Sequence, residues 1–354
     1  MADWAEPFRA SYRFMRVSRS SGREISRLDQ FEQSGSITRN LDTQTKESGT
    51  ARIVGSLDIG SDLVRVYLDA EGLYTGWRES VALGTFLASV SKRDVDGPVS
   101  ASTVDLDGRL LEVAEDDFEA PVSIPAGSSP VDAAVGILEG CGLNVVSDES
   151  DYTLSATWTF GMESDEQGKL SAVNDLLEIA GFSSAVTDTM GNVVLRRYTD
   201  PASRPVAHSF TEGVDARFLS SVTDELDASD VHNVVKVVYS HQGGEVIGVA
   251  EDTDPGSPYS IPSIGRRKVR VERYSDEVDQ DTADAKAAEL LSNERSVTRK
   301  VSLQHVYVPG LTVSSAVDFD YPTAGISGKF AVRTMDIDLG AGCMVTSEIR
   351  RSER

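Results

Sequence analysis

Short runs of alternating apolar and polar residues dominate the first third of the chain. The clearest are SYRFMRV, TARIVGSLD, DLVRVYLDA, VALGTFLASV and ASTVDLDG, each bounded by small or turn-forming residues. Alternation with a period of two is typical of strands that bury one face. Because no helical pattern separates these runs, they predict a barrel or sandwich rather than βαβ units.

A change of pattern near residue 121 predicts a small α+β region over residues 121–198. In PVSIPAGSSPVDAAVGILEGCG, Ser129 is a candidate N-cap, Pro130 occupies the first helical position, and Gly140 ends the helix. A second helix is predicted in GKLSAVNDLLEIAGF, where Gly181 supplies the left-handed cap. A hairpin follows in SSAVTDTMGNVVLRRY, with its turn around residues 190–192.

The remainder of the chain returns to strand patterns, interrupted by one helix. VHNVVKVVYS and GEVIGVAED flank a hairpin signal at residues 241–244, and KVRVERY predicts a further strand. The helix lies near residues 281–295, where four apolar residues share one face: Ala283, Ala287, Leu290 and Leu291. We therefore expect a first β domain over 1–120, completed by 199–222, an inserted α+β domain over 121–198, and a second β domain over 223–354.

Length and charge restrict the classes of protein that fit this pattern. The chain has 354 residues, of which 40% are hydrophobic, so a sizeable core and two or three domains are expected. The formal net charge of −23 disfavours general binding to nucleic acid. No apolar run approaches the length of a membrane span, and the charged N-terminus MADWAEPFRASYRFMR does not resemble a signal peptide.

Positive charge gathers near the N-terminus, where six arginines accompany a single acidic residue, Glu24. The arginines are Arg9, Arg13, Arg16, Arg19, Arg23 and Arg27. One interpretation is the solvated face of a strand pair. The other is a basic patch that docks on an acidic neighbour.

The four histidines do not have the spacing of a metal or catalytic site. His208, His232, His241 and His305 lie in separate segments, without the HExxH spacing that puts two imidazoles on one metal. In ASDVHNVVKVVYS, Asp230 and Asn233 flank His232 and are turn residues able to bond the local backbone. We interpret this stretch as the start of a strand.

Other catalytic and metal-binding signals are equally weak. The chain contains neither a GxSxG elbow nor a glycine-rich phosphate loop. Cys141 and Cys343 are expected to be reduced and buried rather than paired with each other. The best calcium candidates are the acidic stretches 251–258 and 276–284, and the second lacks the glycine and distal glutamate of an EF-hand. We therefore expect that the protein is not an enzyme and that it binds no cofactor and no metal.

The order of the segments resembles the baseplate hub or tail-tip hub proteins of tailed bacteriophages, also called minor tail proteins. The resemblance rests on RNLDTQTKESGTARIVG followed by DLVRVYLDA, on LSAVNDLLEIAGF and TDTMGNVVLRRYTDP, and on SFTEGVDARFLSSVTDELDASDVHNVVKVVY. It continues through SPYSIPSIGRR, DTADAKAAELLSNERS, HVYVPGLTVSSAVDFDY and ISGKFAVRTMDIDLGAGCMVTSEIRR. Residues 10–350 are covered, and one departure is VSSAVDFD, where such proteins often have a Gly-Asp pair.

This resemblance implies two tail-tube-like β-barrel domains with a small α/β insertion in a mainly β chain. Three chains would form a homotrimeric, pseudo-hexameric ring that joins the six-fold tail tube to three-fold tail-tip or fibre components. The implied partners are the distal tail-tube ring, tip or fibre proteins and the tape-measure protein. Genomic DNA would pass through the lumen without specific binding. The implied location is the distal end of the virion tail, after assembly in the host cytoplasm.

Two other functions remain open at this point. A tail-tip peptidoglycan hydrolase would need His or Glu motifs that the sequence lacks. A receptor- or carbohydrate-binding tail protein would favour exposed loop aromatics, for which Trp77 and Trp158 are the only modest candidates.

Overall fold

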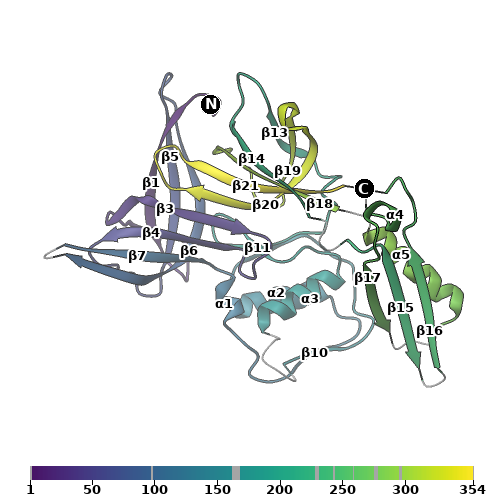
Figure 1. Cartoon of the computed structure of the whole chain (residues 1–354). Coiled ribbons are helices and arrows are strands. Elements are labelled where there is room, and N and C mark those ends of the chain that lie inside the picture. The colour runs from purple at the N-terminus through teal and green to yellow at the C-terminus, as the bar shows by residue number, and fades with distance from the viewer. Residues whose placement is uncertain are drawn as a thin grey trace. The chain divides into compact units, whose positions relative to one another are not determined.

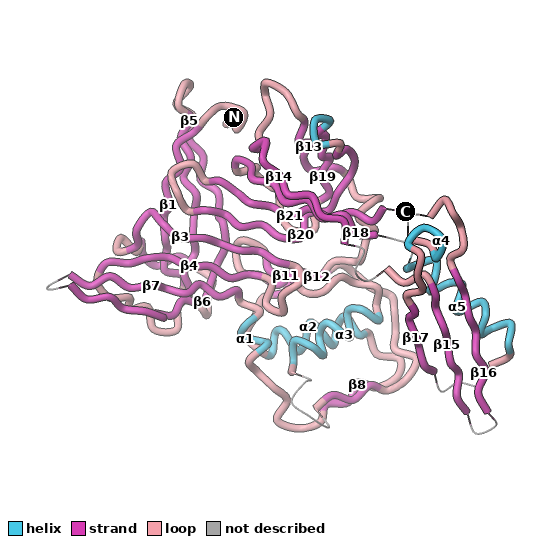
Figure 2. Tube along the Cα trace, viewed as in Figure 1, coloured by secondary structure: helices cyan, strands magenta, loops and turns pink. Residues whose placement is uncertain are grey.

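The computed structural model describes residues 2–96, 99–161, 168–227, 231–241, 244–257, 259–274, 278–294 and 297–353. The chain divides into two compact units, Met1–Ser220 with Leu303–Glu348 (unit 1), and Ser221–Ser302 with Ile349–Arg354 (unit 2). The fold is mainly β, as the residue pattern predicts, and strands make up most of the trace in Figure 2.

A long sheet forms most of unit 1 (Figure 1). Its antiparallel part has the order β20-β3-β4-β7-β6-β5-β1-β2. These strands are β1 (Phe8–Val17), β2 (Glu24–Arg27), β3 (Phe31–Asn40), β4 (Glu47–Val54), β5 (Leu63–Gly72), β6 (Arg78–Asp96), β7 (Val99–Gly108) and β20 (Ile326–Asp338). They include all five of the strand runs expected in the first third of the sequence.

Further strands extend this sheet. β19 (Ala316–Tyr321) pairs antiparallel with β20, and β13 (Val206–Thr211) pairs parallel with β19. Beyond β20 the order continues through β21 (Met344–Glu353) and β18 (Val297–Val306) to β14 (Phe218–Asp227), three strands that have residues in both units. Among the described residues, this order does not close on itself.

The core of the long sheet follows from the alternation in its strands. In β1, Ala10, Tyr12 and Phe14 are buried, whereas Arg9 and Ser11 are exposed. Between β5 and β6 the register shifts after Val66, where Gly84 lies close to the Phe86 ring. A Cβ at Gly84 would lie 2.3 Å from that ring, so the bulge requires glycine.

The region predicted as α+β has its own apolar core within unit 1. It contains α1 (Leu111–Ala114), α2 (Pro130–Gly140) and α3 (Lys169–Ile179). Its short strands are β8 (Val122–Ile124), β9 (Val145–Ser147), β10 (Trp158–Phe160), β11 (Val186–Thr187) and β12 (Val193–Leu195). The Ser129 hydroxyl caps α2 by accepting a hydrogen bond from the Asp132 amide at 3.1 Å, which confirms the predicted N-cap.

Unit 2 contains a three-stranded sheet with one helix packed on a face. β15 (Val234–His241) pairs antiparallel with β16 (Gly244–Glu251) and parallel with β17 (Val269–Tyr274). The predicted helix is confirmed as α5 (Gln280–Glu294), and its Ala283, Ala287 and Leu291 pack on β15. Two very short helices, α4 (Ile261–Ile264) in unit 2 and the 3₁₀ turn η1 (Pro322–Ala324) in unit 1, complete the fold.

Candidate functional site: the arginine strand and the adjoining cavity

β1, the following turn and β2 carry the six N-terminal arginines along the edge region of the long sheet, and we call this segment, residues 9–27, the arginine strand. β1 pairs with β5 in the register Arg9↔Glu71, Ser11↔Asp69 and Arg13↔Tyr67. Arg9 and Arg13 therefore share the outward face of β1, while the following turn and β2 carry Arg19, Arg23 and Arg27. The six arginines of the sequence prediction are therefore spread along the length of β1, the following turn and β2.

Arg13, Arg16 and Arg19 have ion pairs with acidic residues of other segments. Arg13 Nε lies 3.1 Å from Asp69 Oδ2, and the Arg13 guanidinium stacks over the Tyr67 ring at 4.4 Å from its centroid. Arg16 pairs with Asp62 at 2.6 Å, and Arg19 pairs with Glu112 at 2.5 Å. These acids come from other segments, so the arginine run is much less basic in the fold than in the sequence.

The ion pair also shifts the pKa values of Arg13 and Asp69. Burial raises the pKa of Asp69, but hydrogen bonds from Arg13 and Ser80 outweigh that effect, so the pKa lies below its ordinary value. The same hydrogen bond raises the pKa of Arg13. The pair is therefore charged at any physiological pH.

Arg9, Arg23 and Arg27 remain exposed to solvent. Arg27 pairs with Asp29 at 2.8 Å, but both side chains are more than half exposed. For Arg23, no ion pair is seen within the described part of the chain. Exposed pairs of this kind contribute little to stability, which leaves these three side chains available to a partner.

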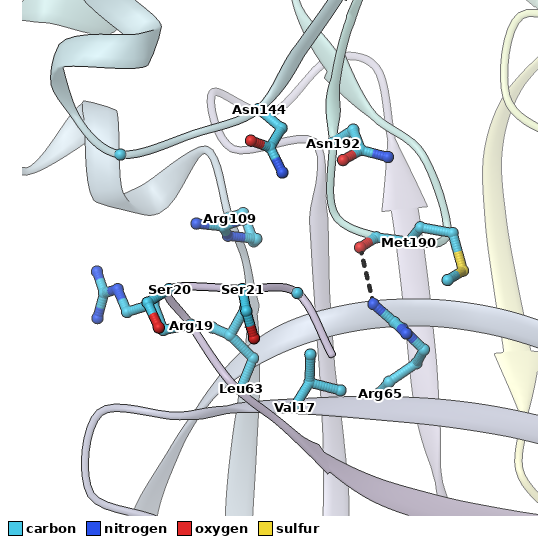
Figure 3. A pocket seen from close by; sticks show the side chains of 12 residues that line it. Val17, Arg19, Ser20, Ser21, Leu63, Arg65, Arg109, Asn144, Met190 and Asn192 are labelled. Carbon is cyan, nitrogen blue, oxygen red and sulfur yellow. Dashed lines mark hydrogen bonds between the residues drawn. The ribbon is translucent and has the colours of Figure 1, made fainter. Parts of the chain in front are cut away.

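A cavity of about 330 Å³ opens beside the turn that follows β1. Figure 3 shows its walls converging from the β1–β2 turn, β5, the segment before α1, the loop after α2 and the β11–β12 turn. The lining residues are Val17, Arg19, Ser20, Ser21, Gly22, Leu63, Arg65, Arg109, Gly142, Asn144, Met190 and Asn192.

Two buried arginines hold the β11–β12 turn at this cavity. Arg65 donates from Nε to the Thr85 hydroxyl at 2.9 Å and from Nη2 to the Met190 carbonyl at 3.1 Å, the bond drawn in Figure 3. Arg109 donates to Glu112 at 2.9 Å and to the Gly191 carbonyl at 3.3 Å. Gly191 has φ +85°, and a Cβ there would lie 3.0 Å from Arg109 Cδ, so the turn requires glycine.

Sequence reasoning did not identify Arg65 or Arg109. Arg65 stands in the run DLVRVYLDA, where Leu63, Val64 and Val66 are buried as well. An arginine inside such an apolar run is the signal that points to a buried charge with a partner, because an unpaired one is too costly to bury.

The histidines do not converge on a common site. His305 is fully buried, and burial lowers its pKa to about 4. Its Nδ1 lies 2.7 Å from the Val306 carbonyl and its Nε2 2.9 Å from the Ser347 hydroxyl, which is a structural arrangement. Burial, with Arg217 nearby, also lowers the pKa of His208. His232 precedes β15, as predicted for the start of a strand, and the side chain of His241 lies outside the described residues.

The expected turn role of Asn233 takes a different form. Its side chain does not bond the local backbone but donates to the carbonyls of Tyr259 and Arg266 and accepts from the Lys268 amide. These partners lie 26 to 35 residues away in sequence. Asp230 lies outside the described residues.

The remaining sequence candidates can be placed individually. Cys141 and Cys343 are both free, and Cys343 is buried as expected. Cys141, which was also expected to be buried, is only partly buried, and its thiol donates to Asp116 at 3.5 Å. In the first calcium candidate, Asp252 accepts from the Ser257 hydroxyl and the Asp254 amide. Residue 258 of that stretch and residues 276–277 of the second lie outside the described residues. In the part of the chain that the structure describes, no cluster of three or more metal-ligating side chains occurs.

The helices of the described residues include none long and apolar enough to cross a bilayer. Trp77 and Trp158, the candidate receptor-binding aromatics, instead contact other rings. The ring centroid of Trp77 lies 5.0 Å from that of Trp4 and 6.1 Å from that of Phe8. The ring centroids of Trp158 and Phe160 are 6.0 Å apart.

Comparison with known proteins gives a consistent picture at the level of fold. No protein-family model matches the sequence, and no curated protein matches it. Among solved structures, a tail protein from Neisseria meningitidis matches with a TM-score of 0.65 and 13% identity, covering 96% of this chain and 97% of that one. The 43 kDa tail protein of prophage MuSo2 from Shewanella oneidensis matches with a TM-score of 0.63 and 11% identity, covering 97% and 98%.

A third match is a chain of the PdpA–VgrG complex from Francisella, with a TM-score of 0.58 and 8% identity. It covers 97% of this chain but only 58% of the Francisella chain. The two tail proteins are matched almost from end to end, so the likeness includes both units of the fold. The chain therefore has the fold of phage and prophage tail proteins, as the resemblance in its sequence predicts.

Proposed function

We propose that this chain is a structural subunit of the tail or baseplate of a tailed phage. The supporting observation is the match over 96–97% of the chain to two tail proteins of nearly the same length. A match that extended only over the long sheet would leave unit 2 unexplained. The interior of this chain is consistent with a role in assembly, because the buried His305 and Arg39 are held by structural partners.

The finer proposal is that three copies form a hub with pseudo-six-fold symmetry. Each chain would contribute two barrel-like β domains, over 1–120 completed by 199–222 and over 223–354, with 121–198 as an insertion. A ring with six similar β domains could stack on a six-fold tail tube and accept three-fold tip or fibre proteins on its other side. Closed rings of identical contacts are a common way to build such assemblies.

The arginine strand is the proposed contact with a neighbouring tail protein. Because Arg13, Arg16 and Arg19 are held by Asp69, Asp62 and Glu112, the exposed Arg9, Arg23 and Arg27 would contribute most to it. Complementary charges at an interface mainly accelerate and orient association. The acidic balance of the rest of the chain would suit a lumen that repels the DNA backbone.

Two measurements test the trimeric hub: the mass of its assembly in solution and a reconstruction of the intact particle. Sedimentation of the purified chain with its tail-tube ring should give the mass of the ring plus three copies of the 38.1 kDa chain. Cryo-electron microscopy of intact particles should then place a ring with six β lobes at the distal end of the tail. Absence of the chain from purified particles would overturn the structural role. A ring with another number of copies would overturn only the trimer.

The arginine contact needs a separate experiment. Replacing Arg9, Arg23 and Arg27 with Ala should slow assembly onto the tail tube and reduce its dependence on salt. Replacing Arg52 and Arg196, two exposed arginines outside β1, β2 and the turn between them, is the matched control. Equal assembly rates in the two variants would remove the arginine strand from the proposal.

A further inference from the structure

The outward face of the long sheet carries four aligned aspartates. The strand register across β20, β3, β4, β7 and β6 forms two rows of outward side chains. One row includes Asp336 and Asp107, the next includes Asp338 and Asp105, and the positions on β3 and β4 between them are all Ser or Thr. The residue between each pair of aspartates is buried in the core, whereas all four aspartates are at least partly exposed. We call these four residues the acid face.

The charge of the acid face is not compensated within the chain. Among the described residues, none of its four aspartates takes part in an ion pair. Arg52 and Lys92 occupy the next row of the same sheet face, but they pair with Glu32 and Asp94. The acid face therefore presents negative charge to whatever approaches it.

The neighbouring carboxylates also affect one another. Burial, together with the negative charges of Asp105 and Glu115, raises the pKa of Asp107 above its ordinary value. A cation placed between these side chains would relieve the repulsion.

The composition of this surface indicates the kind of partner that it fits. Protein interfaces with an apolar centre are enriched in aromatic residues and depleted of Asp and Ser. The two rows contain Asp, Ser and Thr with a single apolar residue, Leu87, and no aromatic side chain. Recognition at the acid face must therefore be electrostatic, and the complementary partner is basic.

The same chain carries a complementary surface. Arg9, Arg23 and Arg27 of the arginine strand are exposed. In the strand order β20-β3-β4-β7-β6-β5-β1-β2, the rows of the acid face extend over the first five strands and the arginine strand occupies the last two. The two surfaces are therefore distinct, and one copy can present its arginines while it receives those of another.

We propose that the arginine strand of one copy docks on the acid face of a second copy of this chain. A guanidinium and a carboxylate form short, charge-assisted hydrogen bonds, and several such pairs fix the register of two surfaces. A contact between two different surfaces of identical chains is heterologous, and it closes into a ring when the rotation between copies permits. The inference rests on the proposed hub and identifies the neighbour of the arginine strand, but its test needs only the purified chain.

Sedimentation velocity of the wild-type chain gives the first measurement. Self-association should be present at low salt and should weaken as NaCl is raised from about 50 mM to about 500 mM, because salt screens exposed charges. A wild-type chain that stays monomeric at low salt, or that associates equally at both salt concentrations, would overturn the proposal.

Two charge-reversal variants identify the surfaces. The strand variant combines Arg9→Glu, Arg23→Glu and Arg27→Glu, and the face variant combines Asp105→Lys, Asp336→Lys and Asp338→Lys. Each variant alone brings like charges together, so its self-association should be weaker than that of the wild type by about tenfold or more.

A mixture of the two variants should associate again. The glutamates of the strand variant then meet the lysines of the face variant, while the arginines of the face variant meet the aspartates of the strand variant. A variant that had merely misfolded would not be rescued by mixing. An equimolar mixture that associates no better than the separate variants would exclude this contact.

The matched control reverses three exposed arginines outside both surfaces, Arg196, Arg266 and Arg267. Replacing them with Glu changes the net charge as much as the strand variant does, yet association should stay within about threefold of the wild type. A loss as large as that of the strand variant would show that net charge, not the contact, controls association. Particle reconstruction tests the hub separately, because a trimer whose acid face is open to the lumen would refute this contact and leave the hub intact.

Discussion

The two units hold an irregular segment against a sheet in different ways. In unit 1, charged side chains hold the β11–β12 turn against the long sheet. In unit 2 the segment 252–268 is tied to the start of β15 by an uncharged amide. Each solution satisfies buried polar groups, but the two respond differently to mutation, salt and pH.

In unit 1, the contact between the β11–β12 turn and the long sheet depends on buried charged side chains. Glu47 is almost fully buried, accepts from Arg39 Nε at 3.0 Å, and also accepts from the Thr187 hydroxyl on β11. Burial raises the pKa of Glu47, and the Arg39 charge and the Thr187 hydroxyl act against that rise. Arg65 and Arg109 add the carbonyl contacts at Met190 and Gly191.

The contact in unit 2 needs no charge at its centre. The Asn233 side chain makes hydrogen bonds of 3.1, 2.9 and 2.7 Å to the backbone of Tyr259, Arg266 and Lys268. Asp252 then fixes the beginning of the segment through Ser257 and Asp254. A neutral amide is cheaper to bury than an ion pair but loses more hydrogen bonds per side chain when it is removed.

Glu47→Ala should have the largest effect. It leaves Arg39 buried without its carboxylate, and breaking one side of a buried pair costs about 4 kcal/mol of unfolding free energy. Urea denaturation measures the loss, and hydrogen exchange should show earlier opening of residues 186–195 than in the wild type. Glu71→Ala, which removes the partner of the exposed Arg78, should leave the denaturation midpoint unchanged.

A second test uses pH, because the interior of unit 1 also contains His305. Its folded pKa of about 4 lies below the value of an unfolded histidine, so only the unfolded chain binds a proton between pH 6.5 and 4. The stabilisation is complete above pH 6.5 and is lost as the pH falls to 4, a change of about 3 kcal/mol.

His305→Gln isolates this contribution from the carboxylates that titrate in the same range. The variant has no imidazole, so its unfolding free energy should decline less steeply than that of the wild type between pH 6.5 and 4. Parallel pH profiles for the two proteins would show that His305 has the same pKa in the folded and the unfolded chain, contrary to its buried contacts with Val306 and Ser347.

The elements of the fold could be predicted from the sequence where the signals are local. Ser129 and Pro130 mark the start of α2, Gly181 follows α3, and the alternating runs give the strands. The four-residue helices α1 and α4 are too short to show a helical period and were missed, although Ser260 precedes α4 and a left-handed Gly265 ends it. The parallel pairing of β13 with β19 joins segments about a hundred residues apart, which periodicity does not encode.

The candidate site was predicted only in part for the same reason. The arginines of β1 and the following turn were found because they are neighbours in sequence. Arg65 and Met190, which meet at the cavity, are 125 residues apart. Their contact depends on how the α+β region lies against the long sheet, and no spacing within one segment reports it.

Asn233→Ala is the smallest of the three expected effects and tests the uncharged contact directly. The substitution removes the amide that donates to the Tyr259 and Arg266 carbonyls and accepts from the Lys268 amide. Buried backbone groups are then left unsatisfied, so we expect the unfolding free energy to fall by about 2 kcal/mol. Because no charge is left behind, this loss should not vary with salt. Hydrogen exchange at the Lys268 amide is the most direct measurement.

The control is Asn144→Ala, which truncates an exposed asparagine and should keep the unfolding free energy within about 0.5 kcal/mol of the wild type. If the Lys268 amide stays protected in Asn233→Ala and stability is unchanged, water or neighbouring side chains must replace the amide. The segment 252–268 would then be held by its own turns rather than by β15.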